Sequence, residues 1–237
     1  MRSGRLVFVD LETAEASGVW SVIQVAAVAV SSTLHELGSF EAKLPVSRTV
    51  SHRHSDESTW NREAKPLQEV AKSFGEFLRE HASIPMTSVE GPSYRVAQIV
   101  AHNAEFDGAM LRAWFDQTGL FFPGHYRMLC TVQRAIWLFQ EAKHQVPPWD
   151  YKLGTLCRYF SVEYRHEEAH DALYDVRATV ELYRAMTAVS GRAGFARSGR
   201  ARRFGDTART RDRRGIGADG SPRVWSPTPR KERPARR

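Results

Sequence analysis

Three apolar runs at the start of the chain are separated by short polar connections. They cover Leu6–Leu11, Val22–Val30 and Glu36–Leu44, and the first two are rich in the β-branched and aliphatic residues that strands prefer. Connections this short suit antiparallel hairpins. The pattern therefore predicts three antiparallel strands.

After these strands the apolar spacing becomes helical. Pro66 precedes a stretch whose apolar residues recur with a helical period through Glu80, which predicts a helix. The same reasoning predicts strands at Ala97–Ala101 and Tyr126–Cys130, and helices at Ala104–Thr118, Thr131–Glu141, Leu153–Phe160 and Asp171–Ala188. The polar, irregular stretch Val46–Ala64 is expected to be a surface loop or an insertion. Three strands followed by alternating helices and strands indicate one α/β domain around a mixed sheet.

Charge divides the chain into two parts. The 237 residues include 34 Lys+Arg and 27 Asp+Glu, for a net charge of +7. Residues 190–237 hold 15 of the basic and 4 of the acidic residues, so this tail carries +11 and the remainder carries −4. The tail is rich in Arg, Gly, Pro and Ser and has few large apolar residues, which predicts disorder. We therefore expect one domain over residues 1–189 and a disordered Arg-rich tail over residues 190–237.

Composition excludes several other classes of protein. A chain with 42% hydrophobic and 26% charged residues is typical of a soluble globular protein, and no apolar run approaches the roughly 20 residues of a membrane-spanning helix. The first predicted strand begins at Leu6, which leaves no room for a removable leader. Cys130 and Cys157 are too few to indicate a disulfide framework or a zinc site. We expect a cytoplasmic protein without a membrane partner.

Two acids interrupt the first apolar run. Asp10 and Glu12 are two residues apart, so on a strand their side chains point to the same face. Charged groups seldom enter a core unless they are paired or bind a metal, and converging carboxylates suit hard cations such as Mg²⁺ or Mn²⁺. Two acids at a solvated strand end would have the same spacing, so the pair alone leaves both interpretations open.

Polar residues also follow the strand predicted to end at Ala101. His102 and Asn103 come next, and Asp107 lies in the first turn of the following helix, where the helix macrodipole favours an acid. Ligands of open α/β sheets bind at the carboxyl ends of strands, which makes Asn103 a candidate for a hydrogen bond to a polar substrate group. Phe106 is either a core residue or a substrate contact.

The last predicted helix carries a further acid. Asp175 lies on this helix, and His170 lies just before it, so the imidazole need not follow helical geometry. A histidine near a helix start is more often a surface or capping residue than a catalytic one. His170 is a functional candidate because it occurs together with Asp175 and with the acids of the other two segments.

Together these segments resemble a known family. D-L-E-T at Asp10–Thr13, H-N-A-E-F-D at His102–Asp107 and H-D-A-L-Y-D at His170–Asp175 match the motifs of the DEDDh 3′→5′ exonucleases of the DnaQ-like superfamily. The resemblance spans Leu6–Met186. It implies a ribonuclease H-like fold: a mixed five-stranded sheet, with three antiparallel strands and then two parallel ones, flanked by helices.

The resemblance also implies a subclass and a mechanism. The sister DEDDy group has a tyrosine four residues before the last aspartate, where this chain has Asp171, so His170 places it in the histidine subclass. The family's four acids hold two divalent ions, Mg²⁺ or Mn²⁺, and here they are Asp10, Glu12, Asp107 and Asp175. His170 would be the general base in a hydrolysis that releases 5′-mononucleotides from a nucleic-acid 3′ end. The candidates for binding the terminal nucleotide are Thr13, His102, Asn103 and Phe106.

The resemblance leaves the substrate open. The family often has T-T-G after its first motif where this chain has Thr13-Ala14-Glu15, so contacts to the terminal nucleotide are expected to differ. The motif variants are closer to the proofreading-type branch, which favours DNA as the substrate and makes a DNA polymerase a candidate partner. The alternatives are an exoribonuclease or oligoribonuclease-like RNA-trimming enzyme, and a non-catalytic nucleic-acid-binding module.

The tail is expected to support substrate binding. An Arg-rich segment gains salt-dependent affinity from phosphate contacts, so we expect the tail to bind the nucleic-acid backbone and to offset the acidic body. A solubilising extension without a partner is the alternative.

Overall fold

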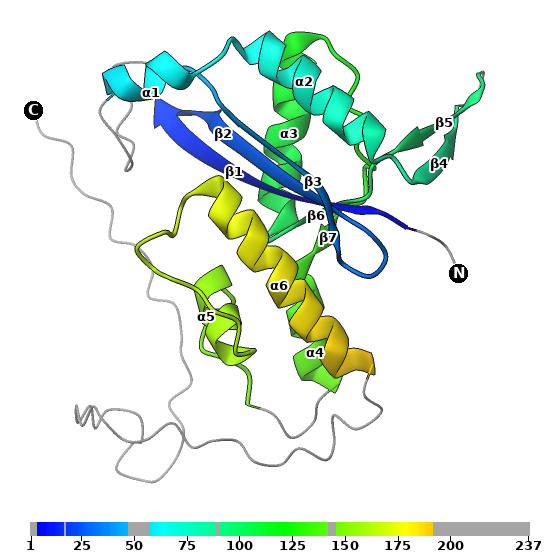
Figure 1. Cartoon of the computed structure of the whole chain (residues 1–237), viewed down its shortest axis with the longest axis vertical. Helices are drawn as coiled ribbons and strands as arrows, with labels where there is room; N and C mark the ends of the chain where they lie inside the picture. Colours follow the sequence, from blue (N-terminus) through cyan, green and yellow to red (C-terminus); the bar gives the residue numbers. More distant parts are fainter. Residues whose placement is uncertain (1–3, 17, 47–56, 89–90, 142–145, 192–237) are drawn as a thin grey trace, which may run out of the picture. The chain divides into compact units, whose positions relative to one another are not determined.

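A mixed sheet forms the centre of the fold (Figure 1). Its strands are β1 (Leu6–Ala16), β2 (Val19–Val30), β3 (Glu36–Lys43), β6 (Ile99–Ala101) and β7 (Leu129–Cys130). They lie in the order β3-β2-β1-β6-β7, with β1 to β3 antiparallel and with β6 and β7 parallel to β1. The predicted fold class is therefore confirmed. The predicted strand at Tyr126–Cys130 is reduced to its last two residues, because β6 is itself only three residues long and offers few partners.

The computed structural model describes residues 4–16, 18–46, 57–88, 91–141 and 146–191. These residues all belong to one compact unit, Met1–Ser198. The expected disorder of the tail concerns residues that lie almost entirely outside this description. Within the described ranges, no helix is long and apolar enough to cross a membrane.

Helices cover both faces of the sheet (Figure 1). One face packs against α2 (Leu67–Glu80) and α3 (Ala104–Thr118), and the other packs against α6 (Ala172–Gly191). Two shorter helices, α4 (Thr131–Glu141) and α5 (Leu153–Tyr159), pack against α6 rather than against the sheet. The arrangement gives two main hydrophobic layers, one on each side of the strands.

The alternation of side chains along β1 decides where its acids point. Val7, Val9 and Leu11 are buried in the layer beneath α2 and α3, whereas Phe8 is buried in the layer beneath α6. Because a strand has a period of two, Asp10 and Glu12 share the face of Phe8. The two acids therefore lie on the side of the sheet that α6 covers.

Three further elements, a helix and the two strands of a hairpin, differ from the sequence prediction. The expected loop Val46–Ala64 contains α1 (Glu57–Glu63), and its Trp60 is buried with an indole N–H that donates to the main-chain oxygen of Leu44 at 2.9 Å. A single buried aromatic in a polar stretch gives too weak a period to predict this helix. The hairpin of β4 (Ile84–Thr87) and β5 (Ser93–Val96) was also not predicted, because most of its residues are exposed and its apolar alternation is short.

Candidate active site

One cleft collects most of the candidate residues. It has a volume of about 830 Å³ and is lined by β1, by the residues between β6 and α3, by α5 and by the segment that precedes α6. The predicted site residues in its lining are Asp10, Glu12, His102, Asn103, His170 and Asp175. Thr13 and Phe106 lie outside this lining. Asp107 is buried, with 3% of its surface exposed.

Burial and mutual repulsion perturb the acids at the bottom of the site. Burial, followed by the charges of Asp107, Asp175 and Glu12, raises the pKa of Asp10 well above its usual range. Burial also raises the pKa of Asp107 to about 7, although main-chain hydrogen bonds from Asp107 itself and Leu11 oppose the increase. The acids that raise the pKa of Asp10 form a negative cluster around it, which a bound cation would stabilise.

Three potential metal ligands converge beside this cluster. The ligand atoms of Glu12, His170 and Asp175 all lie within 4.8 Å of one another. Carboxylate oxygens are the donors that Mg²⁺ and Mn²⁺ prefer, and the neighbouring negative charges that raise the pKa of Asp10 indicate a site short of positive charge. The residues present therefore fit a divalent cation.

Asp175 is held in place by hydrogen bonds to both of its carboxylate oxygens. The Tyr164 hydroxyl donates to Oδ1 at 2.9 Å, and the main-chain N–H of His170 donates to Oδ2 at 3.0 Å. Burial raises the pKa of Asp175, and these two hydrogen bonds oppose the increase because they stabilise the ionised form. The carboxylate is thus oriented by the segment before α6.

His170 is placed outside helical geometry, as its sequence position predicts. Its backbone has φ of 70°, in the left-handed region that costs a non-glycine residue about 1 kcal/mol or more. Asp171 follows as the N-cap of α6, and its Oδ1 accepts the main-chain N–H of Tyr174 at 2.9 Å. Because α6 begins only at Ala172 and His170 has a left-handed backbone, the His170 imidazole lies outside the helix and is exposed at the cleft.

His102 and Asn103 take up different local roles. Burial lowers the pKa of His102 to about 4, so its ring is neutral at pH 7. Nε2 lies 3.0 Å from the main-chain oxygen of Tyr151 and must donate to it, so Nδ1 accepts from the Thr131 hydroxyl at 2.8 Å. Asn103 caps α3 in the left-handed conformation, at φ of 67°, and its side chain makes no capping hydrogen bond. The Asn103 amide is therefore the better placed of the two for contact with a substrate.

Thr13 and Phe106 lie beside the cleft. The pairing of β1 with β2 shifts register between Glu12 and Thr13, a β-bulge of the kind that redirects side chains next to active sites. Phe106 is 40% exposed, and its ring meets the edge of Trp20 with 6.4 Å between centroids. These two rings form an exposed aromatic pair in the first turn of α3 and the start of β2.

The cleft also has a basic and aromatic wall that sequence reasoning did not assign. It comes from α5 and its flanking segments and contains Trp149, Tyr151, Lys152, Arg158, Tyr164 and His166. Trp149 is 84% exposed, and Arg158 lies 3.1 Å from His166 through Nη2 and Nε2. These residues have no motif or period that marks them as contact residues in the sequence.

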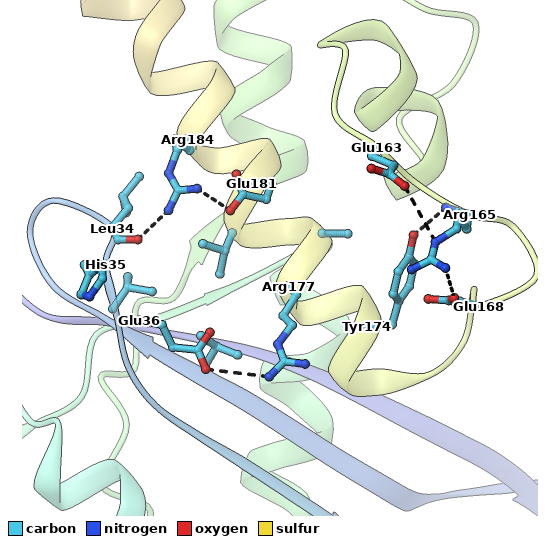
Figure 2. Close-up of a pocket in the computed structure, with 14 residues that line it drawn as sticks. Leu34, His35, Glu36, Glu163, Arg165, Glu168, Tyr174, Arg177, Glu181 and Arg184 are labelled. Atoms are coloured by element: carbon cyan, nitrogen blue, oxygen red, sulfur yellow. Dashed lines mark hydrogen bonds and ion pairs between the residues drawn. The ribbon is translucent and has the colours of Figure 1, made fainter.

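A second hollow, of about 660 Å³, lies between α6 and the β2–β3 connection (Figure 2). Each of its arginines faces a glutamate: Arg165 faces Glu163 and Glu168, Arg177 faces Glu36, and Arg184 faces Glu181. Charges matched in this way do not repel one another, unlike the acids of the first cleft. The chemistry of the motifs therefore belongs to the first cleft.

The chain belongs to the family of nucleases described as "Exonuclease" (RNase_T), whose model matches residues 7–183. This identifies the class of protein that the fold and the cleft define.

The chain also has curated relatives that are less than 30% identical to it. The chain is similar to PolC-type DNA polymerase III of Caldanaerobacter subterraneus, with 26% identity over 185 residues, and of Bacillus cereus, with 28% identity over 177 residues. These matches cover 76% and 73% of the chain but only 11% of each polymerase.

Solved structures share its fold. Escherichia coli exonuclease I in complex with a dT oligonucleotide aligns with a TM-score of 0.58 and 17% identity, covering 80% of this chain and 41% of that one. The nuclease domain of 3'hExo, a DEDDh family member bound to rAMP, also gives a TM-score of 0.58, with 14% identity, covering 80% of this chain and 94% of that one.

Proposed function

We propose that this protein is a metal-dependent 3′→5′ exonuclease that releases 5′-mononucleotides from nucleic-acid 3′ ends. The observation that carries the proposal is the convergence of Glu12, His170 and Asp175 within 4.8 Å, beside the perturbed carboxyls of Asp10 and Asp107. Membership of the exonuclease family supports the class of reaction.

The four acids Asp10, Glu12, Asp107 and Asp175 would hold two divalent ions. Such a pair polarises the scissile phosphate, lowers the pKa of a water and stabilises the leaving oxygen. The exposed imidazole of His170 accepts the proton of the attacking water, a transfer that contributes about 10²–10⁴ in rate for a well-placed base. Asp175 helps to place this base, because its Oδ2 accepts the main-chain N–H of the same residue.

The remaining cleft residues are suited to binding the substrate. Lys152 and Arg158 would contact phosphates on the wall opposite the acids, and Trp149 offers an exposed ring for stacking a base. The Asn103 amide is a hydrogen-bonding candidate for the terminal nucleotide, with Phe106 and Trp20 beside the cleft. Thr13 and His102 remain proposed substrate-binding residues. His102 would act through its hydrogen bonds with Thr131 and Tyr151, which position these neighbours.

We propose single-stranded DNA as the preferred substrate, with RNA trimming as the alternative. The similarity to PolC-type DNA polymerase III supports DNA and a polymerase partner, although the chain spans about a tenth of the length of these relatives. The 3'hExo nuclease domain bound to rAMP supports the RNA alternative through fold alone. We propose action in the cytoplasm.

We propose that the tail, residues 190–237, adds affinity for the phosphate backbone. Its charge of +11 opposes the −4 of residues 1–189, and each phosphate contact contributes a salt-dependent increment. Deleting these residues should raise KM and flatten the dependence of KM on salt. An unchanged KM and salt dependence would favour a solubilising role.

The function is tested with matched single-stranded DNA and RNA oligonucleotides labelled at the 5′ end. In Mg²⁺ or Mn²⁺, wild type should shorten them stepwise from the 3′ end, and EDTA should stop the reaction. Asp10→Ala and Asp175→Ala should abolish activity while circular dichroism shows an intact fold, and Asp116→Ala, an exposed acid of α3, is the matched control. Full activity in Asp10→Ala or Asp175→Ala would refute the assignment of ligands. Binding without cleavage by wild type would favour the non-catalytic module.

A further inference from the structure

The segment between α5 and α6 is fastened at three consecutive residues. The Tyr164 hydroxyl donates to Asp175, the main-chain N–H of Arg165 donates to the Tyr174 hydroxyl at 2.5 Å, and His166 pairs with Arg158 of α5. Only the first of these contacts reaches a proposed metal ligand. Tyr164 therefore provides a side-chain link between this segment and the acidic cluster, in addition to the main-chain N–H of His170.

Contacts with neighbouring residues restrict the orientation of the Tyr164 ring and therefore the position of its hydroxyl. It contacts the Tyr174 ring with 5.5 Å between centroids and the His166 ring at the same distance. On its other side it approaches Gly154 of α5, where an added Cβ would lie 2.9 and 3.0 Å from the ring carbons Cε1 and Cδ1. Contacts this short are not tolerated, so glycine at 154 is what allows the ring to reach this position.

The hydroxyl also keeps its role as a donor. A tyrosine hydroxyl is protonated at neutral pH and its partner here is a carboxylate oxygen, so the Tyr164 hydroxyl is the donor. A carboxylate has about four lone-pair sites. With Tyr164 on Oδ1 and His170 N–H on Oδ2, the Asp175 carboxylate is fixed in its plane while lone pairs on both oxygens remain for a cation.

We propose that Tyr164 is a positioning residue that orients the Asp175 carboxylate for metal binding, with Gly154 providing the space for its ring. The proposal rests on the proposed function, because it assumes that Asp175 is a metal ligand. Partners that hydrogen-bond a ligating carboxylate fix its orientation, and their loss commonly lowers metal affinity or activity by about 10–100-fold.

The test measures metal binding without turnover. Mn²⁺ is titrated into the full chain by isothermal titration calorimetry for wild type, Tyr164→Phe, the control Tyr94→Phe and the reference Asp175→Asn. Phenylalanine keeps the ring packing on Gly154 and removes only the hydroxyl, whereas Tyr94 is an exposed tyrosine on the β4–β5 hairpin. We expect Tyr164→Phe to weaken Mn²⁺ binding by about tenfold or more, with Tyr94→Phe at the wild-type value.

Two further measurements separate positioning from a general effect on the fold. Thermal unfolding in EDTA should be close to wild type for Tyr164→Phe, and the Mn²⁺ concentration for half-maximal nuclease activity should rise in parallel with the dissociation constant. Gly154→Ala, which displaces the ring while the hydroxyl remains, should also weaken Mn²⁺ binding.

The outcomes distinguish this inference from the proposed function. Mn²⁺ affinity of Tyr164→Phe equal to or tighter than that of Tyr94→Phe would overturn the positioning role while wild type remained a metal-dependent nuclease. Wild type without saturable Mn²⁺ binding, or with affinity unchanged by Asp175→Asn, would overturn the proposed function and the inference together.

Discussion

Asp107 gives the metal-free protein a predictable dependence of stability on pH. Its carboxyl is 3% exposed, and burial raises its pKa from 3.8 to about 7. Between these values the unfolded chain is ionised at this position while the folded protein keeps the proton. The folded state therefore binds more protons, and the free energy of unfolding decreases as the pH rises from about 4 to about 7.

The size of this effect follows from the same values. A tenfold difference in proton affinity corresponds to about 1.4 kcal/mol, so the change from 3.8 to about 7 corresponds to roughly 4 kcal/mol at pH 8, as an upper limit. Asp107→Asn cannot ionise but keeps an oxygen that can accept the Leu11 N–H. We therefore expect this variant to be more stable than wild type in EDTA at pH 8, by up to about 4 kcal/mol, and to differ little near pH 4.

The assay is urea unfolding followed by circular dichroism in EDTA at pH 4, 5, 6, 7 and 8. Asp116→Asn changes an exposed acid on the same helix and should keep the wild-type pH dependence. Adding Mn²⁺ at pH 8 should stabilise wild type more than Asp107→Asn, which should also lack nuclease activity. If wild type and Asp107→Asn lose stability in parallel as the pH rises, burial of this carboxyl is not the cause.

Three other substitutions test separate parts of the molecule. His170→Ala should lower kcat by about 10²–10⁴ while Mn²⁺ affinity measured by calorimetry stays near wild type, and unchanged turnover would exclude it as the base. Phe106→Ala should raise KM for single strands by about 5–100-fold, the equivalent of one lost base stack, whereas Phe121→Ala, an exposed aromatic beside the β4–β5 hairpin, should not. Trp60→Ala should lower the free energy of urea unfolding by about 3–5 kcal/mol, against little change for the exposed Trp149→Ala.

The proposed site draws its ligands from the sheet and from helices on both of its faces. Asp10 and Glu12 come from β1, Asp107 comes from α3 on one face of the sheet, and Asp175 comes from α6 on the other. Asp107 comes just after β6, whose carboxyl end lies in the region where open α/β sheets bind ligands. Cations at this point would offset the burial and the neighbouring negative charges that raise the pKa of Asp10, and the burial that raises the pKa of Asp107.

The central strands, most of the helices and the grouping of the acids into motifs can be predicted from the sequence. These features have local signals, since β1 begins with an uninterrupted apolar run and apolar residues recur helically along α2, and they are visible without knowing which segments meet. The motif order also indicated that Asp10, Asp107 and Asp175 would act together. The exonuclease family and the mixed sheet confirm the class of protein and its fold.

The tertiary structure alone decided what surrounds these residues. Three hydrogen bonds join residues that are distant in sequence: Tyr164 to Asp175 over 11 positions, Thr131 to His102 over 29, and Trp60 to Leu44 over 16. Such contacts leave no period in the sequence, because they arise when separately predicted elements pack together. Burial also arises when the elements pack together. It raises the pKa of Asp107, an acid that the sequence alone places only in the first turn of a helix.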